Sequence, residues 1–385
     1  MNPTSPLAVL LALAQIYIVM SLLGAASRRW SGAKRNAAWA ALLFFETLIL
    51  IAYVGSFSYR FKLDSAGSFR PLLGAISLVY LAISAGILAL YLVLRPIRKH
   101  LDSPTDPARR RALDLAGSAL LCSPIAAISY GSLIQRTDFE VKEIDVPMPG
   151  LSADLDGLRI LQISDIHLSP FLSEKELARM IDATLGLHPH VAFITGDLIS
   201  SRGDPLDACI RQLARVKADA GVFGCLGNHE FYAGVMRETP VMAARFGMRF
   251  LRSQTAPLRF GNSVLNVAGI DYQPSYRNKR YLRGAPGLAM PGAFNLLLSH
   301  NPDVFPLAVR QGYDLVLAGH THGGQVNIEI FGESVNPARF YTPYVYGLYC
   351  QDRSVQYVTR GIGTIGVPVR LGAPPEVALL RLRKT

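Results

Sequence analysis

Five of the eight histidines in this chain lie in four short polar motifs. Each motif follows a segment with the apolar pattern of a buried strand, and a fifth segment, Gly-Asp, does the same. Loops at strand ends bring distant parts of a chain into one crevice, where α/β folds usually bind ligands. We therefore expect five segments to converge: Asp165-Ile166-His167, Gly196-Asp197, Gly227-Asn228-His229-Glu230, Ser299-His300 and Gly319-His320-Thr321-His322-Gly323-Gly324.

The residue types are those of a paired metal centre. In Asp165-x-His167 both side chains project to the same side of an extended segment, so a carboxylate oxygen and an imidazole nitrogen can hold one ion. His320-x-His322 has the same spacing. Asp197 follows a glycine at a strand end, which suits a carboxylate that bridges two ions. Oxygen and nitrogen ligands without thiolate favour Mn, Fe, Zn, Co or Ni.

The elements that position these motifs alternate at first between strand and helix. A capping box of Ser173 and Glu176 opens one of the helices. Strand patterns cover residues 139–146, 159–164, 191–195 and 221–226, with helices over 173–187 and 206–217. The second half is richer in strands, over 265–270, 294–299, 315–318, 325–330, 356–359 and 377–381, with a helix over 302–310. The pattern predicts an α/β fold with two packed sheets and helices outside, a two-sheet α/β sandwich.

The first 135 residues have a different character. The chain is 50% hydrophobic and 17% charged, against about 25% charged for an average soluble protein. Four apolar stretches, at 6–26, 37–55, 71–94 and 112–134, are each long enough to cross a bilayer, which takes about 20 helical residues. The first is no cleaved signal peptide, because it lacks a basic leading region. We predict a four-helix transmembrane domain in 1–135, a linker with a leading strand in 136–156, and a domain carrying the motifs in 157–385.

Lys and Arg in the short loops set the expected orientation. They concentrate between the first and second stretches and between the third and fourth, which places both loops in the cytoplasm and the second domain outside. Much of the net charge of +11 lies in this membrane part, so no nucleic-acid partner is expected. Glu46, inside the second stretch, is interpreted as a hydrogen-bonded packing residue in preference to a transport or ligand site. The four cysteines lack metal-ligand spacing, although an outward domain permits one disulfide.

The order of the motifs resembles the calcineurin-like metallophosphoesterase superfamily. More narrowly, GHTHGGQ (319–325), LSHNPD (298–303) and RGIGTIGVPVRLGAPP (360–375) are similar to membrane-associated bacterial phosphoesterases of the YkuE and YaeI type. The resemblance covers about residues 140–385 and makes 157–385 a catalytic domain. It implies two divalent metal ions, the first held by Asp165, His167, Asp197 and His322, and the second by Asp197, Asn228, His300 and His320.

The resemblance also assigns the chemistry. His229 is the catalytic histidine that binds no metal, and a hydroxide activated by both ions attacks the phosphorus in line. The superfamily usually has Asp where this chain has Glu230, and the resemblance implies that this acid orients His229. The implied substrate is a phosphate ester.

Anchoring suggests that the ester is a phospholipid or a lipid-linked phosphate at the outer face of the bacterial cytoplasmic membrane. Two alternatives stay open: a pyrophosphatase for a nucleotide-linked lipid at the cytoplasmic face, and a membrane sensor or transporter with a regulatory metal-binding domain. His188 and His190 match no ligand position and are expected in loops. Four tyrosines are expected either to line a substrate groove or to pack against a sheet: Tyr341, Tyr344, Tyr346 and Tyr349.

Overall fold

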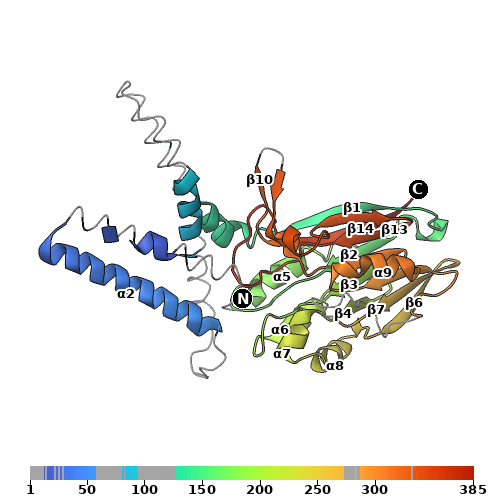
Figure 1. Cartoon of the computed structure of the whole chain (residues 1–385). Helices are drawn as coiled ribbons and strands as arrows, with labels where there is room; N and C mark the ends of the chain where they lie inside the picture. Colours follow the sequence, from blue (N-terminus) through green and yellow to red (C-terminus); the bar gives the residue numbers. More distant parts are fainter. Residues whose placement is uncertain are drawn as a thin grey trace. The chain divides into compact units, whose positions relative to one another are not determined.

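The structure is a computed structural model that describes residues 126–272, 282, 287–330 and 333–385, with shorter pieces of the first part of the chain. Those pieces are residues 13, 15–20, 23–24, 27, 30–57, 80–81, 83–93 and 116. The chain divides into two compact units. One comprises residues 1–131 and 366–368, and the other comprises residues 132–365 and 369–385. The second unit holds all five of the polar motifs at strand ends, and Figure 1 labels its strands and helices.

The described part of the first unit is helical. Helix α2 (Gly32–Phe57) has 26 residues and contains the whole predicted stretch 37–55. Residues 15–20, 83–93 and 126–130 are also helical and fall within the other three predicted stretches, whose remaining parts lie mainly outside the described residues. In the parts of the chain that the structure describes, we find no helix with both the length and the apolar character needed to cross a membrane.

Glu46 has hydrogen-bond partners from two other helical segments of this unit. Its Oε2 accepts from Nε2 of Gln15 at 2.7 Å, and its Oε1 accepts from the Tyr80 hydroxyl at 2.5 Å. Because both carboxylate oxygens are occupied by neutral donors, this geometry favours the packing interpretation of Glu46 over a transport role.

The first sheet of the second unit has six strands in the order β1-β14-β2-β3-β4-β5. All neighbours are parallel except β14 and β2. Strand β1 continues through Pro147, one residue past its predicted end, because it lies at the sheet edge, where a missing N–H costs no ladder bond. The strands are β1 (Glu140–Met148), β14 (Glu376–Lys384), β2 (Arg159–Ile163), β3 (Val191–Thr195), β4 (Val222–Cys225) and β5 (Arg249–Phe250).

The second sheet also has six strands, in the order β12-β13-β9-β8-β7-β6. Its inner pairs are parallel, whereas β12–β13 and β6–β7 are antiparallel. A separate hairpin joins β10 (Ile328–Ile330) and β11 (Glu333–Val335). The strands of the sheet are β6 (Gln254–Phe260), β7 (Ser263–Gly269), β8 (Phe294–Leu298), β9 (Leu315–Ala318), β12 (Gly347–Gln351) and β13 (Ser354–Val358).

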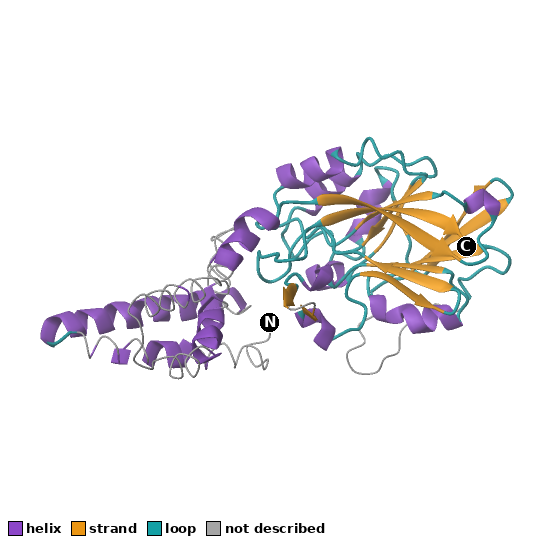
Figure 2. Cartoon of the chain, turned by 90° about the horizontal axis from the view of Figure 1, so that it is seen from above, coloured by secondary structure: helices purple, strands orange, loops and turns teal. Residues whose placement is uncertain are grey.

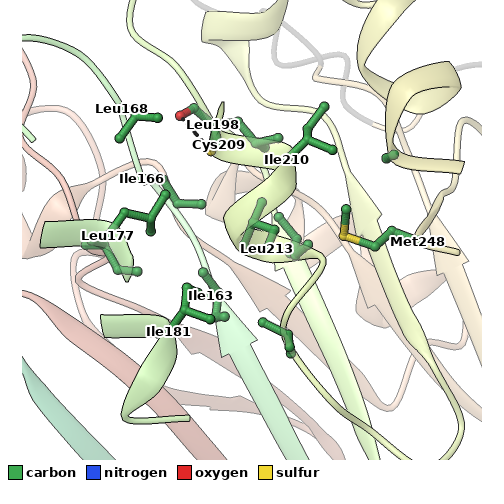
Figure 3. Packing of buried hydrophobic residues seen from close by; sticks show 14 of the residues in the cluster. Ile163, Ile166, Leu168, Leu177, Ile181, Leu198, Cys209, Ile210, Leu213 and Met248 are labelled. Atoms are coloured by element: carbon green, nitrogen blue, oxygen red, sulfur yellow. Dashed lines mark hydrogen bonds between the residues drawn. The ribbon is translucent and has the colours of Figure 1, made fainter. Parts of the chain in front are cut away.

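Three buried apolar clusters order these elements into layers. Alternate residues of the first sheet face opposite ways: Ile160 and Phe193 pack between the two sheets, whereas Leu161 and Ile194 pack under helices. The helix layer on the first sheet contains α5 (Glu174–Asp182), α6 (Leu206–Leu213) and α8 (Glu238–Ala244), and Figure 3 shows its contacts. Helix α9 (Phe305–Arg310) packs on the second sheet. The result is an α/β fold with two mixed sheets between helices (Figure 2).

Two helix predictions differ from the structure at their ends. The capping box is present as expected, because the Ser173 hydroxyl accepts from Glu176 N while Glu176 accepts from Ser173 N. However, α5 ends at Asp182 and α6 at Leu213, both four or five residues early. In each case successive turns continue the predicted segment, with Leu187 N donating to Thr184 O after α5.

Candidate metal centre

Five loops bring the predicted ligands together at the ends of parallel strands. Strands β2, β3 and β4 run parallel, so their carboxyl ends lie at one edge of the first sheet. Strands β8 and β9 do the same in the second sheet. Each strand ends within three residues of a predicted ligand: Asp165 after β2, Asp197 after β3, Asn228 after β4, His300 after β8 and His320 after β9. The fold therefore explains why short motifs far apart in sequence converge.

The residues expected to hold the first ion lie within ligand distance of one another. Nε2 of His167 is 3.2 Å from Nε2 of His322 and 3.4 Å from Oδ2 of Asp197. Nε2 of His322 is 3.4 Å from Oδ1 of Asp165. All four side chains are buried, with 0–3% of their surface exposed. Buried groups of this kind need a partner that neutralises and coordinates them.

A second group shares Asp197 with the first. Nε2 of His300 is 3.0 Å from Oδ2 of Asp197 and 3.2 Å from Nδ1 of His320. Asn228 belongs to this group by position, and its side-chain oxygen is buried without a hydrogen-bond partner. A buried carbonyl oxygen with no partner is costly, and coordination to a cation would satisfy it.

The distances fit metal coordination. Ligand atoms that lie about 2.0–2.2 Å from one ion are separated from each other by about 3.0–3.6 Å. The distances from Asp197 Oδ2 to Nε2 of His167 and of His300, 3.4 and 3.0 Å, both fall in that range and share one carboxylate oxygen. Together with the orphaned oxygen of Asn228, these separations show that the residues present fit two ions that share Asp197.

Five of the seven predicted ligands have an unusual backbone conformation. Their φ angles are positive, between 49° and 75°, in the left-handed region that residues with a Cβ rarely adopt. Each such residue costs on the order of 1–3 kcal/mol and persists only where its surroundings enforce it. The strain is thus concentrated at one site, as expected for a functional centre. The five are Asp165, His167, Asp197, His320 and His322.

Two glycines allow the loops to approach each other. A Cβ on Gly227 would lie 2.1 Å from Oδ1 of Asp197, and a Cβ on Gly196 would lie 2.5 Å from Gly227 N. Real Cβ atoms do not tolerate such distances, so no side chain fits at either position. The Gly-Asp and Gly-Asn-His-Glu motifs therefore need their glycines for close approach of backbone to the carboxylate.

Outer contacts orient the ligand imidazoles. Nδ1 of His300 donates to the carbonyl of Thr195 at 2.7 Å, which leaves Nε2 for a metal. Nδ1 of His167 lies 3.2 Å from the Ser200 hydroxyl. Such partners on the second ring nitrogen fix the tautomer and the ring plane of metal-binding histidines. Neither contact was assigned from the sequence, because a backbone carbonyl or a single serine hydroxyl has no recognisable sequence motif.

Glu230 does not do what the resemblance implied. Its carboxylate is fully buried and accepts three backbone hydrogen bonds, from Leu198 N at 2.7 Å, Gly227 N at 2.7 Å and Asp197 N at 3.0 Å. The expectation that it orients His229 is therefore wrong. Its longer side chain reaches past the start of α7 (Asn228–Ala233) to the Gly-Asp loop, and so it joins two ligand loops.

His229 is held by other groups. Its Nδ1 donates to the carbonyl of Ser200 at 2.6 Å, and its backbone N–H donates to Oδ1 of Asp197 at 2.8 Å. Its ring lies edge-on to that of His167, with centroids 4.6 Å apart, and 5.5 Å from the ring of Tyr232. Burial lowers the pKa of His229 below its ordinary value, and the nearby carboxylate of Asp197 only partly opposes this. The imidazole is therefore neutral at pH 7.

The electrostatics of the remaining groups follow from burial and mutual contact. Burial would raise the pKa of Asp197, but His300 and His167 outweigh it and hold that pKa well below its usual range. Burial would lower the pKa of His300, but Asp197 and Asp165 raise it to about 10. Burial and the charge of His300 lower the pKa of His320 to about 3. A proton on His300 thus balances the carboxylates, and metal binding would displace it.

Other residues near the centre escaped prediction. The ring of Tyr272 lies 5.8 Å from that of His320 and 6.3 Å from that of His300. The guanidinium of Arg370 lies 3.4 Å from Nδ1 of His322. Arg370 stands inside a segment that carried the resemblance, so its motif was visible although its contact was not.

Several residues outside the centre have structural roles. Nδ1 of His190 accepts from Arg159 N at 2.9 Å, and His188 occupies an exposed loop, as expected. Among the four tyrosines only Tyr341 is largely exposed, at 79%. The other three pack within the fold, through the Tyr344–Tyr349 ring contact and the Arg360–Tyr346 contact. Three cysteines of the described residues are free, with Cys209 and Cys225 buried and Cys350 exposed.

Comparison with known proteins agrees with this arrangement. Residues 158–324 match the family described as calcineurin-like phosphoesterase. An uncharacterized metallophosphoesterase of Campylobacter jejuni is 32% identical over 251 residues, 63% of this chain and 63% of that protein. The uncharacterized metallophosphoesterase YkuE of Bacillus subtilis is 28% identical over 261 residues, 66% of this chain and 87% of that protein.

A third relative extends over more of the chain. The transmembrane protein with metallophosphoesterase domain of Bos taurus is 26% identical over 363 residues, which cover 90% of this chain and 79% of that protein. The chain spans less than two thirds of the Campylobacter protein's length, 63%. The resemblance seen in the motifs is confirmed: residues 158–324 match the calcineurin-like phosphoesterase family, and the similar proteins include metallophosphoesterases such as YkuE.

Proposed function

We propose that this chain is a metal-dependent phosphoric ester hydrolase with two divalent ions in the candidate metal centre. One observation carries the proposal: Oδ2 of Asp197 lies within 3.0–3.4 Å of an imidazole nitrogen from each half of the centre, His300 and His167. A carboxylate in that position can bind both ions at once. Asp165, His167 and His322 would complete the first half, and Asn228, His300 and His320 the second.

Bound there, two ions would supply a water of lowered pKa as nucleophile and positive charge for the phosphoryl oxygens. The chain itself supplies orientation. Thr195 and Ser200 fix the ligand rings, and Glu230 fixes the loop of Asp197. Because these groups are held before a substrate arrives, little reorganisation is needed during reaction.

His229 is the residue of the centre best placed to act on a substrate. Its Nδ1–H donates to the carbonyl of Ser200, so Nε2 is the ring nitrogen left for a substrate oxygen. It is less buried than the ligands beside it. Once Nε2 has taken up a proton, the imidazolium can stabilise negative charge on the phosphoryl and leaving oxygens, and we assign His229 to this role, for which it need not bind a metal.

Membrane anchoring forms the second part of the proposal. It is supported by the four apolar stretches before residue 135 and by the Bos taurus relative, whose name describes a transmembrane protein and whose match covers 90% of this chain. We propose a transmembrane domain in 1–135, a linker in 136–156 and a catalytic domain in 157–385 on the outer face of the membrane. The substrate would then be a phospholipid or a lipid-linked phosphate.

Hydrolysis by the full chain tests the enzymatic part. The purified protein, stripped of metal and then given Mn, Zn, Ni or Mg, is assayed with bis(p-nitrophenyl) phosphate and p-nitrophenyl phosphate. We expect metal-restored hydrolysis that Asp197→Asn and His229→Ala both abolish. The matched control is His188→Asn, in an exposed loop with positive φ, which should behave as wild type.

The two site variants should fail for different reasons. Asp197→Asn should lose metal affinity, whereas His229→Ala should keep both ions and lose turnover. Tight metal binding by the wild type with no turnover of either ester would contradict the hydrolase and favour a regulatory metal-binding domain.

Reporter fusions test the location. With alkaline phosphatase fused after residue 135, an outward catalytic domain predicts an active reporter, and a fluorescent protein at the same position should stay dark. The reverse pattern would contradict the outer face and favour a cytoplasmic pyrophosphatase.

A further inference from the structure

Arg370 is a fully buried cation beside the first half of the metal centre. It has 0% of its surface exposed and lies in the segment that precedes β14. Its guanidinium donates to backbone carbonyls of Gly363 at 3.0 Å, Ala373 at 3.0 Å and Arg360 at 2.9 Å. Longer contacts reach Gly361 O at 3.2 Å and His322 O at 3.4 Å.

The choice of partners is unusual for a buried charge. Taking an ion out of water costs several kcal/mol, and a buried arginine normally recovers this through a carboxylate. Arg360 does so, because it pairs with Glu376 at 2.9 Å and with Glu140. In the described part of the chain Arg370 forms no ion pair, and its bonds go to carbonyls and to the ring of His322. Burial lowers the pKa of Arg370 to about 9, so the group remains charged at pH 7.

Arg370 contacts the loop of one first-ion ligand directly and a segment that is bonded to the loop of another. One contact is to His322 itself, whose Nδ1 lies 3.4 Å from Nη2 and whose backbone carbonyl lies 3.4 Å from Nη1. Apart from Ala373 O, the other partners are carbonyls of residues 360–363, which run against the Asp165 loop. There Gly363 N donates to Asp165 O at 2.6 Å, and a Cβ on Gly361 would lie 2.5 Å from Cβ of Asp165. Arg370 thus links two ligands of one ion.

We infer that Arg370 is a positioning residue for the first ion: by joining the His322 loop to residues 360–363, it holds His322 and Asp165 at coordination distance before a metal binds. The inference rests on the proposed assignment of the two ions but not on ester hydrolysis. It is selective, because none of the described bonds of Arg370 reaches the second-ion residues Asn228, His300 or His320. A flexible lysine keeps the charge but cannot reproduce the fork of five N–H donors.

Two ligand variants allow Mn²⁺ binding at each of the two ion positions to be measured separately. His300→Ala removes a ligand of the second ion only, and His322→Ala removes a ligand of the first only. Mn²⁺ binding to the full chain is measured by calorimetry on each background, with and without Arg370→Lys. Thermal unfolding of the metal-free proteins shows whether each variant is folded. Arg381→Lys is the matched control, because Arg381 is an exposed residue of β14 that pairs with Asp145.

We expect Arg370→Lys to weaken Mn²⁺ binding by about 10–100-fold on the His300→Ala background, the usual range for loss of an outer-shell partner. On the His322→Ala background we expect a change of about twofold or less, because no described bond of Arg370 reaches the second-ion residues Asn228, His300 or His320. In the otherwise unaltered chain, the Mn²⁺ concentration for half-maximal hydrolysis should rise, while kcat at saturating Mn²⁺ should change little.

Equal weakening on both backgrounds would overturn the inference, as would no weakening on either. Unfolding of metal-free Arg370→Lys and Arg370→Gln would also overturn it, because the residue would then support the whole domain. If the His300→Ala protein bound no Mn²⁺ with Arg370 intact, the proposed two-ion centre would be at fault instead. The last case is Mn²⁺ binding that Arg370→Lys weakens only on the His300→Ala background, in a protein that hydrolyses neither ester. That result would support the inference and contradict the proposed hydrolase activity.

Discussion

Replacing Glu230 by glutamine separates two roles for this buried acid, joining the ligand loops or orienting His229. The carboxylate accepts from Leu198 N through one oxygen, and from Asp197 N and Gly227 N through the other. A glutamine amide has one acceptor oxygen. It can keep the two bonds of one side, but its NH₂ group then faces the remaining N–H.

The cost can be worked from these three bonds. A hydrogen bond to a charged acceptor contributes about 1.5–3 kcal/mol, and a neutral one about 0.5–1.5 kcal/mol. Losing one and weakening two gives a loss of about 3 kcal/mol in the free energy of unfolding. For a domain of about 150–250 residues this corresponds to a fall in Tm of roughly 6–12 °C. Mn²⁺ affinity should also fall, by about 10–100-fold, because the Asp197 loop loses its support.

Denaturant unfolding of the full chain measures the loss in the free energy of unfolding, and calorimetric titration with Mn²⁺ measures the loss of affinity. The matched control is Glu238→Gln at the exposed start of α8, which should stay within about 0.5 kcal/mol of wild type. A Glu230→Gln protein with unchanged stability and Mn²⁺ affinity but lost turnover would contradict this role. That result would instead support a role of Glu230 in orienting His229.

Three other changes have defined outcomes. Gly227→Ala places a Cβ 2.1 Å from Oδ1 of Asp197, so turnover should fall by about 100-fold or more. The control Gly186→Ala should retain activity, because the space around its Cβ is open and its φ is not positive. Iodoacetamide should modify Cys350 in the folded chain and spare Cys209 and Cys225, because burial raises the pKa of both thiols well above its ordinary value. Mass spectrometry of the digested protein measures the modification, and equal reaction of all three cysteines would contradict the prediction. Removal of the metal ions by a chelator should lower Tm. An ion that binds only the folded state adds about 2.7 kcal/mol to the free energy of unfolding when its concentration is 100 times its Kd. An unchanged Tm after verified metal loss would contradict this coupling of metal binding to folding.

The strands that position the centre were predictable because they are buried on both faces. Residues 191–195 and 315–318 are continuous apolar runs, and β3 and β9 have those bounds. Less regular strands were missed. Strand β6 contains Pro257, which usually argues against a strand, but β6 lies at the edge of its sheet, where proline is tolerated. The predicted strand 325–330 is broken: Ile328–Ile330 pair in the separate hairpin, and Val326 forms an isolated bridge to Leu371.

The centre was predictable as a set of residues but not as a set of contacts. Six of the seven expected ligands, all except Asn228, lie in clusters that could hold a metal ion, because each motif sits at a strand end. By contrast, Ser200 and Thr195 act through ordinary hydroxyl and carbonyl groups, which no motif marks. The predicted role of Glu230, orienting His229, was wrong for a geometric reason. Glu230 follows His229 in the sequence, but on α7 its side chain turns back to the Asp197 loop. Neighbours in sequence on a helix do not face each other.

Anomalous diffraction from crystals of the full chain grown with Mn²⁺ tests the two-ion centre most directly. We predict two peaks about 3.5–4 Å apart, the spacing of two-metal sites, with Asp197 bound to both. One peak should contact Asp165, His167 and His322, and the other Asn228, His300 and His320. A single peak, or two peaks of which only one contacts Asp197, would contradict the proposed centre.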